Sequence, residues 1–171
     1  MKGSRVAVVM GSDSDLEAAQ TAVKVLKGFG VQYEVSVMSA HRSPEKVWSF
    51  ATGARENGFA VIIAIAGGAA HLAGIIASAT TLPVIGVPLA TNVAGGLDSL
   101  LSTVQMPGGV PVVCVGTGSG GAANAAFAAA RILSLGDAAI AAKLDEHRAA
   151  LAAGVEEKDR KVRALFRKPR S

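Results

Sequence analysis

The sequence is short of three kinds of residue, and each shortage excludes a class of protein. Its 171 residues include a single cysteine, Cys114, so neither a disulfide framework nor a cysteine-based metal cluster can be built. Aromatic residues make up only 4%, which argues against the stacking platforms that bind single-stranded nucleic acid. Charged residues make up 18%, below the usual quarter, and this predicts that part of the surface is buried between subunits.

The net charge of +4 is confined to the C-terminal end. Residues 1–140 contain eight basic and eight acidic side chains, whereas residues 141–171 contain nine basic and five acidic ones. Proteins that bind nucleic acid carry their basic residues on the folded body, so we expect no nucleic-acid partner. The basic end, including the tail from Arg167 to Arg170, is more typical of a solvated helix face.

No charged residue occurs between Phe59 and Ala90, a stretch long enough to cross a membrane. Glycine and proline residues divide it into short segments, which favours buried strands and a short helix over a membrane span. The apolar run after Arg5 extends only from Val6 to Met10, too short for a secretory signal. Together with the lone cysteine, this indicates a cytoplasmic protein that contacts no membrane.

Apolar runs and helical patterns alternate along the chain, which is typical of a single α/β domain with a parallel sheet covered on both faces. Strands are predicted at residues 5–10, 33–38, 60–66, 83–87 and 111–115, and helices at 13–29, 44–57, 70–79, 97–105, 120–135 and 137–166. The α/β core therefore spans about residues 5–135. The last helix is long and charged and no strand follows it, so we expect it to pack on a neighbouring subunit.

Polar turns follow the first three predicted strands, at the edge of the sheet where α/β proteins bind their ligands. The first turn contains Gly11, Ser12, Asp13, Ser14 and Asp15. Its hydroxyls and the free amide groups of a helix start can hold an anion. The aspartates oppose a phosphate unless they face other groups, and Ser14 with Glu17 also matches a simple capping box. Both interpretations remain open.

The second turn holds His41 and Arg42, and a helix start follows it. Ser43 offers a capping hydroxyl, Pro44 fits the first helical position and Glu45 places an acid in the first turn. A titratable imidazole next to a fixed cation suits an anionic substrate that needs proton transfer. A surface turn that holds a histidine and an arginine by chance is the alternative.

The third turn, residues 66–71, contains the glycine pair Gly67 and Gly68 and then His71. Paired glycines allow the backbone to lie against a ligand. His71 would then point into the same crevice as His41. A histidine packed in the core is the alternative.

Residues 116–121 form a G-x-G-x-x-G motif after the fifth predicted strand. Such a motif marks a dinucleotide site only when a further strand carrying an acid follows after about 20 residues. Here a helical pattern continues to the end of the chain. We therefore expect no nicotinamide or flavin cofactor.

Four motifs occur in one order along the chain: Gly11-Ser12-x-Ser14-Asp15, Ser39-Ala40-His41-Arg42, and the stretches 67–72 and 104–111. Together they resemble the bacterial 5-(carboxyamino)imidazole ribonucleotide mutases, the catalytic subunits of phosphoribosylaminoimidazole carboxylase. The resemblance covers about residues 5–135. It implies a flavodoxin-like three-layer fold, a homo-octamer, a role in purine biosynthesis, and no metal or organic cofactor.

The resemblance also implies which residues hold the ribonucleotide substrate. Ser12, Asp15 and Arg42 bind its ribose phosphate end, and Gly11 and Ser14 complete the set of substrate-binding residues in the first turn. The sequence departs from the family pattern in the loop 90–96 and at residues 113–117. Neither departure removes an implied site residue.

The remaining implied roles concern the reacting end of the substrate. Ser39 and Ala40 shape the pocket around the imidazole ring, and His41 is the catalytic proton carrier. The glycine turn closes over the reacting carboxylate. Its implied contacts are Gly67, Gly68, Ala70 and His71.

The implied reaction moves a carboxylate from the exocyclic nitrogen of 5-carboxyamino-imidazole ribonucleotide to ring carbon 4. His41 protonates the carbamate nitrogen, trapped carbon dioxide is attacked by carbon 4, and His41 accepts the ring proton. Relatives that carboxylate aminoimidazole ribonucleotide directly tend to have a lysine after the histidine and a changed glycine turn, so Arg42 favours the mutase. A nucleotide-binding module without activity shares the fold but has no need of His41.

Overall fold

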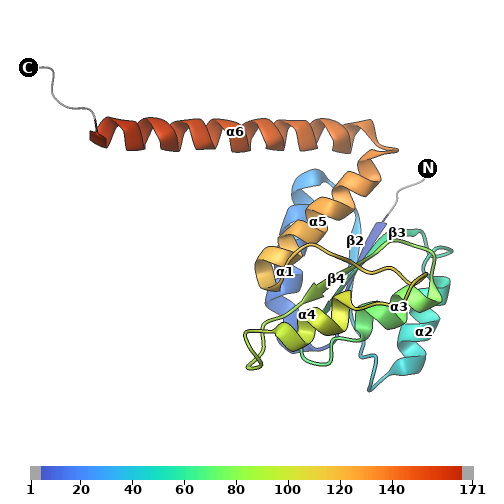
Figure 1. Ribbon diagram of the computed structural model, residues 1–171. Helices are drawn as coiled ribbons and strands as arrows, with labels where there is room; N and C mark the ends of the chain where they lie inside the picture. The colour runs from blue at the N-terminus through green and yellow to red at the C-terminus, as the bar shows by residue number, and fades with distance from the viewer. Residues whose placement is uncertain (1–4, 167–171) are drawn as a thin grey trace, which may run out of the picture.

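The computed structural model describes residues 5–166, and its centre is a five-stranded parallel sheet (Figure 1). The strands lie in the order β2-β1-β3-β4-β5. Their bounds are β1 (Arg5–Met10), β2 (Tyr33–Val37), β3 (Phe59–Ala66), β4 (Val84–Pro88) and β5 (Val113–Cys114). The predicted parallel sheet is confirmed, but the fifth strand is shorter than expected. Pro111 has no amide hydrogen to give to the sheet, and Gly109 has a positive φ of 91°.

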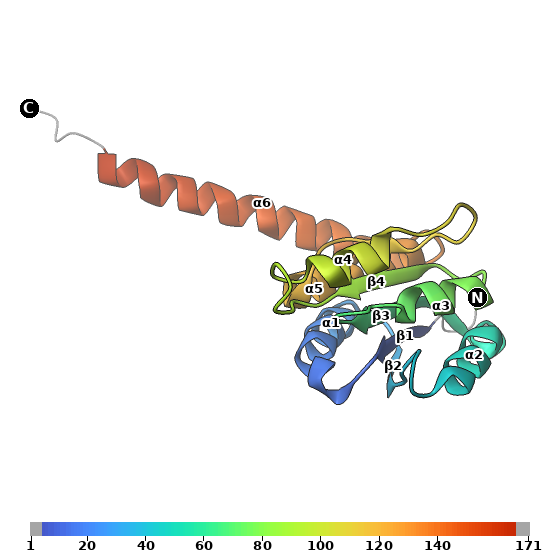
Figure 2. The same cartoon turned by 60° about the horizontal axis from the view of Figure 1, so that its bottom comes forward.

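Helices cover both faces of the sheet and make three layers (Figures 1 and 2). One face carries α1 (Leu16–Phe29), which a short 3-10 turn at Asp13–Asp15 precedes, and α5 (Gly118–Ser134). The opposite face carries α2 (Pro44–Gly53), α3 (Leu72–Ala79) and α4 (Leu97–Val104). The three-layer α/β fold that the sequence predicts is therefore confirmed.

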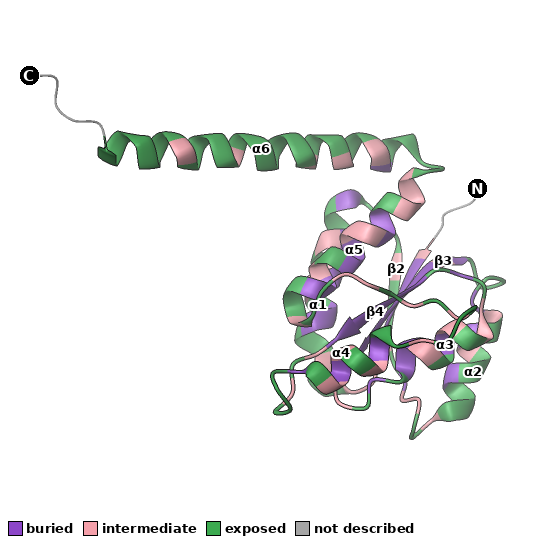
Figure 3. Ribbon diagram, in the orientation of Figure 1, coloured by how far each residue is buried: buried purple, intermediate pink, exposed green. Residues whose placement is uncertain are grey.

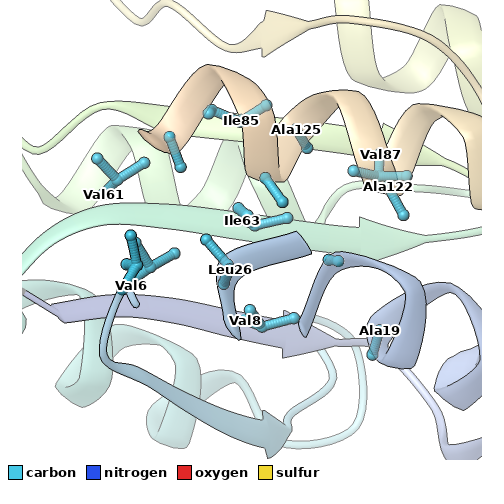
Figure 4. Close-up of a cluster of buried hydrophobic side chains, with 14 of the residues drawn as sticks. Val6, Val8, Ala19, Leu26, Val61, Ile63, Ile85, Val87, Ala122 and Ala125 are labelled. Atoms are coloured by element: carbon cyan, nitrogen blue, oxygen red, sulfur yellow. The ribbon is translucent and has the colours of Figure 1, made fainter. Parts of the chain in front are cut away.

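Strand β3 lies at the centre of the sheet and is buried on both faces. Val61 and Ile63 pack toward α1 and α5, where Leu26 and Ala122 meet them (Figure 4). Ile62 belongs to the second core, under α2 and α3. A strand covered on both sides needs no alternation of polar and apolar residues, which explains its continuous apolar run.

Small residues bring the layers close together. Five fully buried alanines of α5 face α1 and the sheet, namely Ala122, Ala125, Ala126, Ala129 and Ala130. The G-x-G-x-x-G motif also allows close packing, because a Cβ on Gly121 would overlap the backbone of Gly116. In the described residues no strand follows this motif. Its glycines allow the turn before α5 to pack against the helix.

Two predicted caps differ from the structure. The capping box is formed by Ser12 and Asp15, so the predicted box of Ser14 and Glu17 is wrong. The reason is that a 3-10 turn precedes α1, and this turn places the cap two residues earlier. Ser43 does occupy the N-cap position of α2, but its hydroxyl binds the backbone of Ser39 instead of a helical amide.

The last helix, α6 (Ala138–Phe166), extends away from the body of the molecule (Figures 1 and 3). Near its start, Ile140 is buried, the Lys143 ammonium donates to the Phe29 carbonyl at 3.1 Å, and His147 stacks on Phe127. Beyond this point its apolar side chains are exposed. We call them the α6 stripe: Leu151, Val155, Val162, Leu165 and Phe166.

No helix within residues 5–166 has the length and apolar character needed to cross a membrane. The basic tail from Arg167 to Arg170 lies outside the described residues.

Candidate active site

A cavity of about 620 Å³ opens at the carboxyl edge of the sheet. It lies where the segments after β1, β2, β3 and β4 meet, which is the expected ligand position in a parallel α/β fold. The residues that line it are Gly11, Ser12, Ser14, Asp15, Ser39, Ala40, His41, Arg42, Ala66, Gly67, Ala69, Leu72, Leu89 and Ala90.

The turn after β1 is held by its own side chains. The Ser12 amide donates to Asp15 Oδ2 at 3.1 Å, and the Ser14 hydroxyl donates to Asp15 Oδ1 at 3.0 Å. The Ser12 hydroxyl accepts from the Ser14 amide at 3.3 Å. Asp15 therefore faces donors of its own turn, which removes the objection that an aspartate here would repel a phosphate. The capping and ligand-binding interpretations of this turn are compatible.

Arg42 connects the turn after β2 to the turn after β1. Its Nη2 donates to the Gly11 carbonyl at 3.1 Å, and its backbone amide donates to the Ser39 hydroxyl at 3.2 Å. Ser43 closes the same turn, because its hydroxyl accepts from the Ser39 amide at 3.0 Å. The guanidinium, with five N–H groups in a fixed plane, is thereby held at the cavity wall beside Ser12.

The turns after β2 and β3 meet at two histidines. Nε2 of His41 lies 2.9 Å from Nδ1 of His71, and the rings meet edge to face with centroids 5.0 Å apart. Such a contact needs one nitrogen to donate and the other to accept, so the two rings share a single hydrogen. His71 is thus exposed and paired with His41, and the alternative of a core histidine is wrong.

Nine of the twelve predicted site residues line the cavity. Gly68, Ala70 and His71 do not, and Ala70 is buried at 1% exposure. The cavity also has walls outside the predicted site residues, among them Leu89 and Ala90, and Ala90 begins the loop 90–96 that departs from the family pattern. These two residues follow β4 directly. They could have been predicted from the rule that ligands bind at the carboxyl ends of parallel strands, which also predicted the other three turns.

The loop after β4 leads to a carboxyl group whose pKa is shifted by a neighbour. The Thr91 hydroxyl donates to Asp98 Oδ1 at 2.6 Å, and this hydrogen bond lowers the pKa of the Asp98 carboxyl below its usual value. Ala94 in the same loop has a positive φ of 44°, a rare conformation for a residue with a Cβ. Within residues 5–166, no group of three His, Cys, Asp or Glu side chains is arranged to hold a metal ion.

Comparison with known proteins identifies the family. The model of the family described as AIR carboxylase matches residues 5–153. The chain belongs to the AIR carboxylase family. The four motifs at the carboxyl edge and before β5 therefore lie within a family match that covers most of the chain.

Members of the AIR carboxylase family with curated names are similar over nearly the whole chain. A protein of Thermotoga maritima is 48% identical over 161 residues, covering 94% of this chain and 93% of that protein. A protein of Bacillus subtilis is 54% identical, covering 84% and 88%. One of Escherichia coli K12 is 50% identical, covering 86% and 87%. All three are named N5-carboxyaminoimidazole ribonucleotide mutase.

The fold also matches a solved structure. The crystal structure of PurE from Treponema denticola superposes with a TM-score of 0.84 at 31% sequence identity. The match covers 92% of this chain and 97% of that one.

Proposed function

We propose that this protein is an N5-carboxyaminoimidazole ribonucleotide mutase of purine biosynthesis. Membership of the AIR carboxylase family and about 50% identity to proteins with this name support the assignment. The observation that carries it is the pairing of His41 with His71 beside the fixed cation Arg42 at one cavity. Such a site combines a proton carrier with an anchor for an anion, as the reaction requires. We infer a cytoplasmic location from this biosynthetic role.

The phosphate end of the nucleotide binds between the turns after β1 and β2. Two of the five N–H groups of Arg42 are engaged with Gly11 and Ser39, and the other three are available to a phosphate. The hydroxyls of Ser12 and Ser14 lie on the same wall, where they donate to Asp13 and Asp15, and each would have to turn from its carboxylate to donate to a phosphate. Asp15 holds the turn itself through the Ser12 amide.

The proton transfers belong to His41. Its Nε2 is engaged with His71, so its Nδ1 is the ring nitrogen that faces the substrate. Protonation of the carbamate nitrogen by His41 breaks the nitrogen–carbon bond and releases carbon dioxide. Carbon 4 of the ring then forms a bond to this carbon dioxide, and neutral His41 accepts the proton that carbon 4 loses. The proton count is unchanged over the cycle, so one imidazole serves as the acid in the first step and as the base in the second.

Small side chains leave room for the released carbon dioxide. Ala66, Gly67 and Ala69 line the cavity from the turn after β3, and Ala40 and Ala90 line it from two other turns. An apolar wall of this kind offers carbon dioxide no nucleophile. The gas is therefore held next to carbon 4, so that recarboxylation is effectively intramolecular.

The function is tested by supplying the purified protein with two substrates in turn. We expect conversion of 5-carboxyamino-imidazole ribonucleotide to the carbon-carboxylated product, followed by ultraviolet absorbance. Conversion only of aminoimidazole ribonucleotide with carbon dioxide would identify a direct carboxylase. Binding of the nucleotide without conversion of either substrate would identify a binding module.

We also infer that the protein is a homo-oligomer, with eight subunits as the family resemblance implies. Helix α4 supports this inference because its amphipathic pattern is inverted: Ser99 and Thr103 are buried, whereas Leu97, Leu101 and Val104 are exposed. The α6 stripe exposes a second apolar surface. Apolar side chains that are exposed together on one helix face, in a chain with few charges, are typical of subunit contacts. Light scattering that gave a stable monomer at micromolar concentration would contradict the inference.

A further inference from the structure

The glycine turn after β3 is held from behind by a buried hydroxyl of α4. Ser99 is fully buried, and its Oγ accepts a hydrogen bond from the Gly68 amide at 2.8 Å. Among residues 5–166, Ser99 and Thr103 are the only polar residues classed as buried. Thr103 bonds only within its own helix, to the Ser99 carbonyl at 2.8 Å. Of this pair, only Ser99 forms a side-chain hydrogen bond outside α4, whereas Thr103 meets β4 through its methyl group at Gly86.

The turn depends on this support because its own backbone hydrogen bonds join only residues two apart in the sequence and do not connect it to another element. The Ala70 amide binds the Gly68 carbonyl, and the His71 amide binds the Ala69 carbonyl, each at 2.8 Å. Gly68 itself lies in the left-handed region, with a φ of 67°. The remaining contact from α4 is a long one, 3.5 Å from the Ser102 hydroxyl to the Gly68 carbonyl. The bond from Ser99 is therefore the main anchor of the turn on α4.

The anchored turn leads directly to the histidine pair. Gly67 and Ala69 line the cavity on either side of the anchored residue, Gly68. His71 follows three residues after Gly68 and contacts Nε2 of His41 at 2.9 Å. A hydrogen bond of this length is lost when one ring moves by about an ångström.

We propose that Ser99 is a positioning residue, which sets the glycine turn and, through it, the contact between His71 and His41. This inference rests on the proposed function for its effect on turnover. Ser99 itself does not line the cavity and touches no substrate. Replacing Ser99 should therefore change kcat and the hydrogen bond between His41 and His71, and should leave binding of the phosphate end of the substrate unchanged.

The test compares Ser99→Ala with the matched control Thr103→Val. Both substitutions remove a buried hydroxyl from α4, but only the first leaves the Gly68 amide without its partner. We expect kcat of Ser99→Ala to fall about 10- to 100-fold, the range for a partly buried donor that loses its hydrogen-bond partner. KM should change much less, because the phosphate anchors lie on other turns. Thr103→Val should keep the wild-type kcat.

A double variant tests the route of the effect. If Ser99 acts through His71, adding Ser99→Ala to His71→Ala should cost little beyond His71→Ala alone. Equal losses in Ser99→Ala and Thr103→Val, or fully additive losses in the double variant, would overturn the proposal. Ser99→Cys, with a weaker acceptor of similar size, gives an intermediate kcat and serves if the alanine variant fails to fold.

A spectroscopic readout separates this proposal from the proposed function. Nitrogen-15 NMR of the histidine rings reports the shared hydrogen between His41 and His71 without any substrate. We expect its signals to change in Ser99→Ala and to stay as in the wild type in Thr103→Val. An unchanged spectrum in Ser99→Ala would overturn the positioning role. Failure of the wild type to convert the substrate would instead overturn the function alone.

Discussion

The turns at the carboxyl edge of the sheet and the far half of α6 both expose side chains to solvent. The two parts differ in whether these exposed side chains have partners within the chain. In the turns, polar groups bind one another: Arg42 reaches Gly11, and His41 reaches His71. Along α6, the exposed ion pairs are local and the apolar stripe has no partner among the described residues, with Leu165 at 82% exposure. The turns therefore form their contacts within one chain, whereas the α6 stripe is the surface on which we propose a contact with another chain.

The largest effect is expected from His41→Asn, compared with the same substitution at His147 on α6. Asparagine keeps a polar group of similar size but cannot carry a proton near neutral pH. Turnover of His41→Asn should fall about 100- to 10,000-fold, the usual contribution of general acid–base catalysis. Steady-state kinetics with nucleotide binding measured by calorimetry would check this. His147→Asn, which loses the stacking on Phe127, should retain turnover of the same order as the wild type.

Normal turnover in His41→Asn with an intact oligomer would remove His41 from the mechanism. His71 would then be the next candidate.

The second effect concerns assembly and the α6 stripe. The pair Leu151→Glu and Val155→Glu places two carboxylates on the stripe, and Ala149→Glu with Ala153→Glu places two on the opposite side of the same helix. We expect the first pair to weaken subunit association by about 3–6 kcal/mol, from two lost apolar contacts of about 1.5–3 kcal/mol each. Light scattering over a dilution series measures this.

The control is the pair Ala149→Glu and Ala153→Glu, because it adds the same charge to the same helix. Equal weakening by both pairs would show that charge, and not the stripe, controls assembly. Deletion of residues 141–171 should weaken assembly more than it disturbs the sheet, which far-ultraviolet circular dichroism can follow.

A smaller effect is expected from Arg42→Lys. Lysine keeps the charge but cannot hold Gly11 and a phosphate with one planar group. Substrate binding should weaken by about 1–3 kcal/mol, the range for a charged hydrogen bond. Arg55→Lys is the control, since Arg55 binds Thr81 and does not line the cavity. An unchanged KM in Arg42→Lys would exclude Arg42 as a phosphate ligand.

The smallest effect concerns the loop beside the cavity, where Thr91 lowers the pKa of Asp98. A carboxyl with a lowered pKa in the folded state stabilises the fold above its unfolded pKa of about 3.9. This contribution is lost as the pH falls through the folded pKa. Thr91→Val should therefore lower the melting temperature slightly at pH 7, and the difference from wild type should shrink toward pH 3. A difference that stayed constant across this range would mean that Asp98 is not responsible.

The arrangement of the sheet was predictable from the sequence because it depends on patterns that a short window can show. The apolar run of β3 and the start of α2 at Pro44 are of this kind. Prediction failed where the deciding partner is distant or where two local solutions compete. Ser14 and Glu17 match a capping box as well as Ser12 and Asp15 do, and only the 3-10 turn decides between them.

Helix α4 shows why the rest could not be predicted. A single sequence leads one to bury Leu97 and Leu101, since apolar side chains normally face the core. In the structure the smaller Ser99 and Thr103 face inward, because Gly67 and Gly86 bring the sheet too close for larger side chains. The contact of Ser99 with the glycine turn could not be predicted for the same reason, since the sequence pattern places Ser99 on the exposed side of α4.

The residues that line the cavity all come from the first part of the sequence, and this has a consequence for the order in which the ribosome makes the protein. Every residue that lines the cavity precedes residue 91, whereas the alanines of α5, which cover one face of the sheet together with α1, come after residue 121. A ribosome that adds 5–20 residues per second needs about 2–9 seconds to pass from Ala90 to the end of α5. During that interval the nascent chain carries every residue that lines the cavity but lacks α5, and α1 alone covers that face of the sheet. The core on that face is therefore completed only after the whole cavity lining has been synthesised.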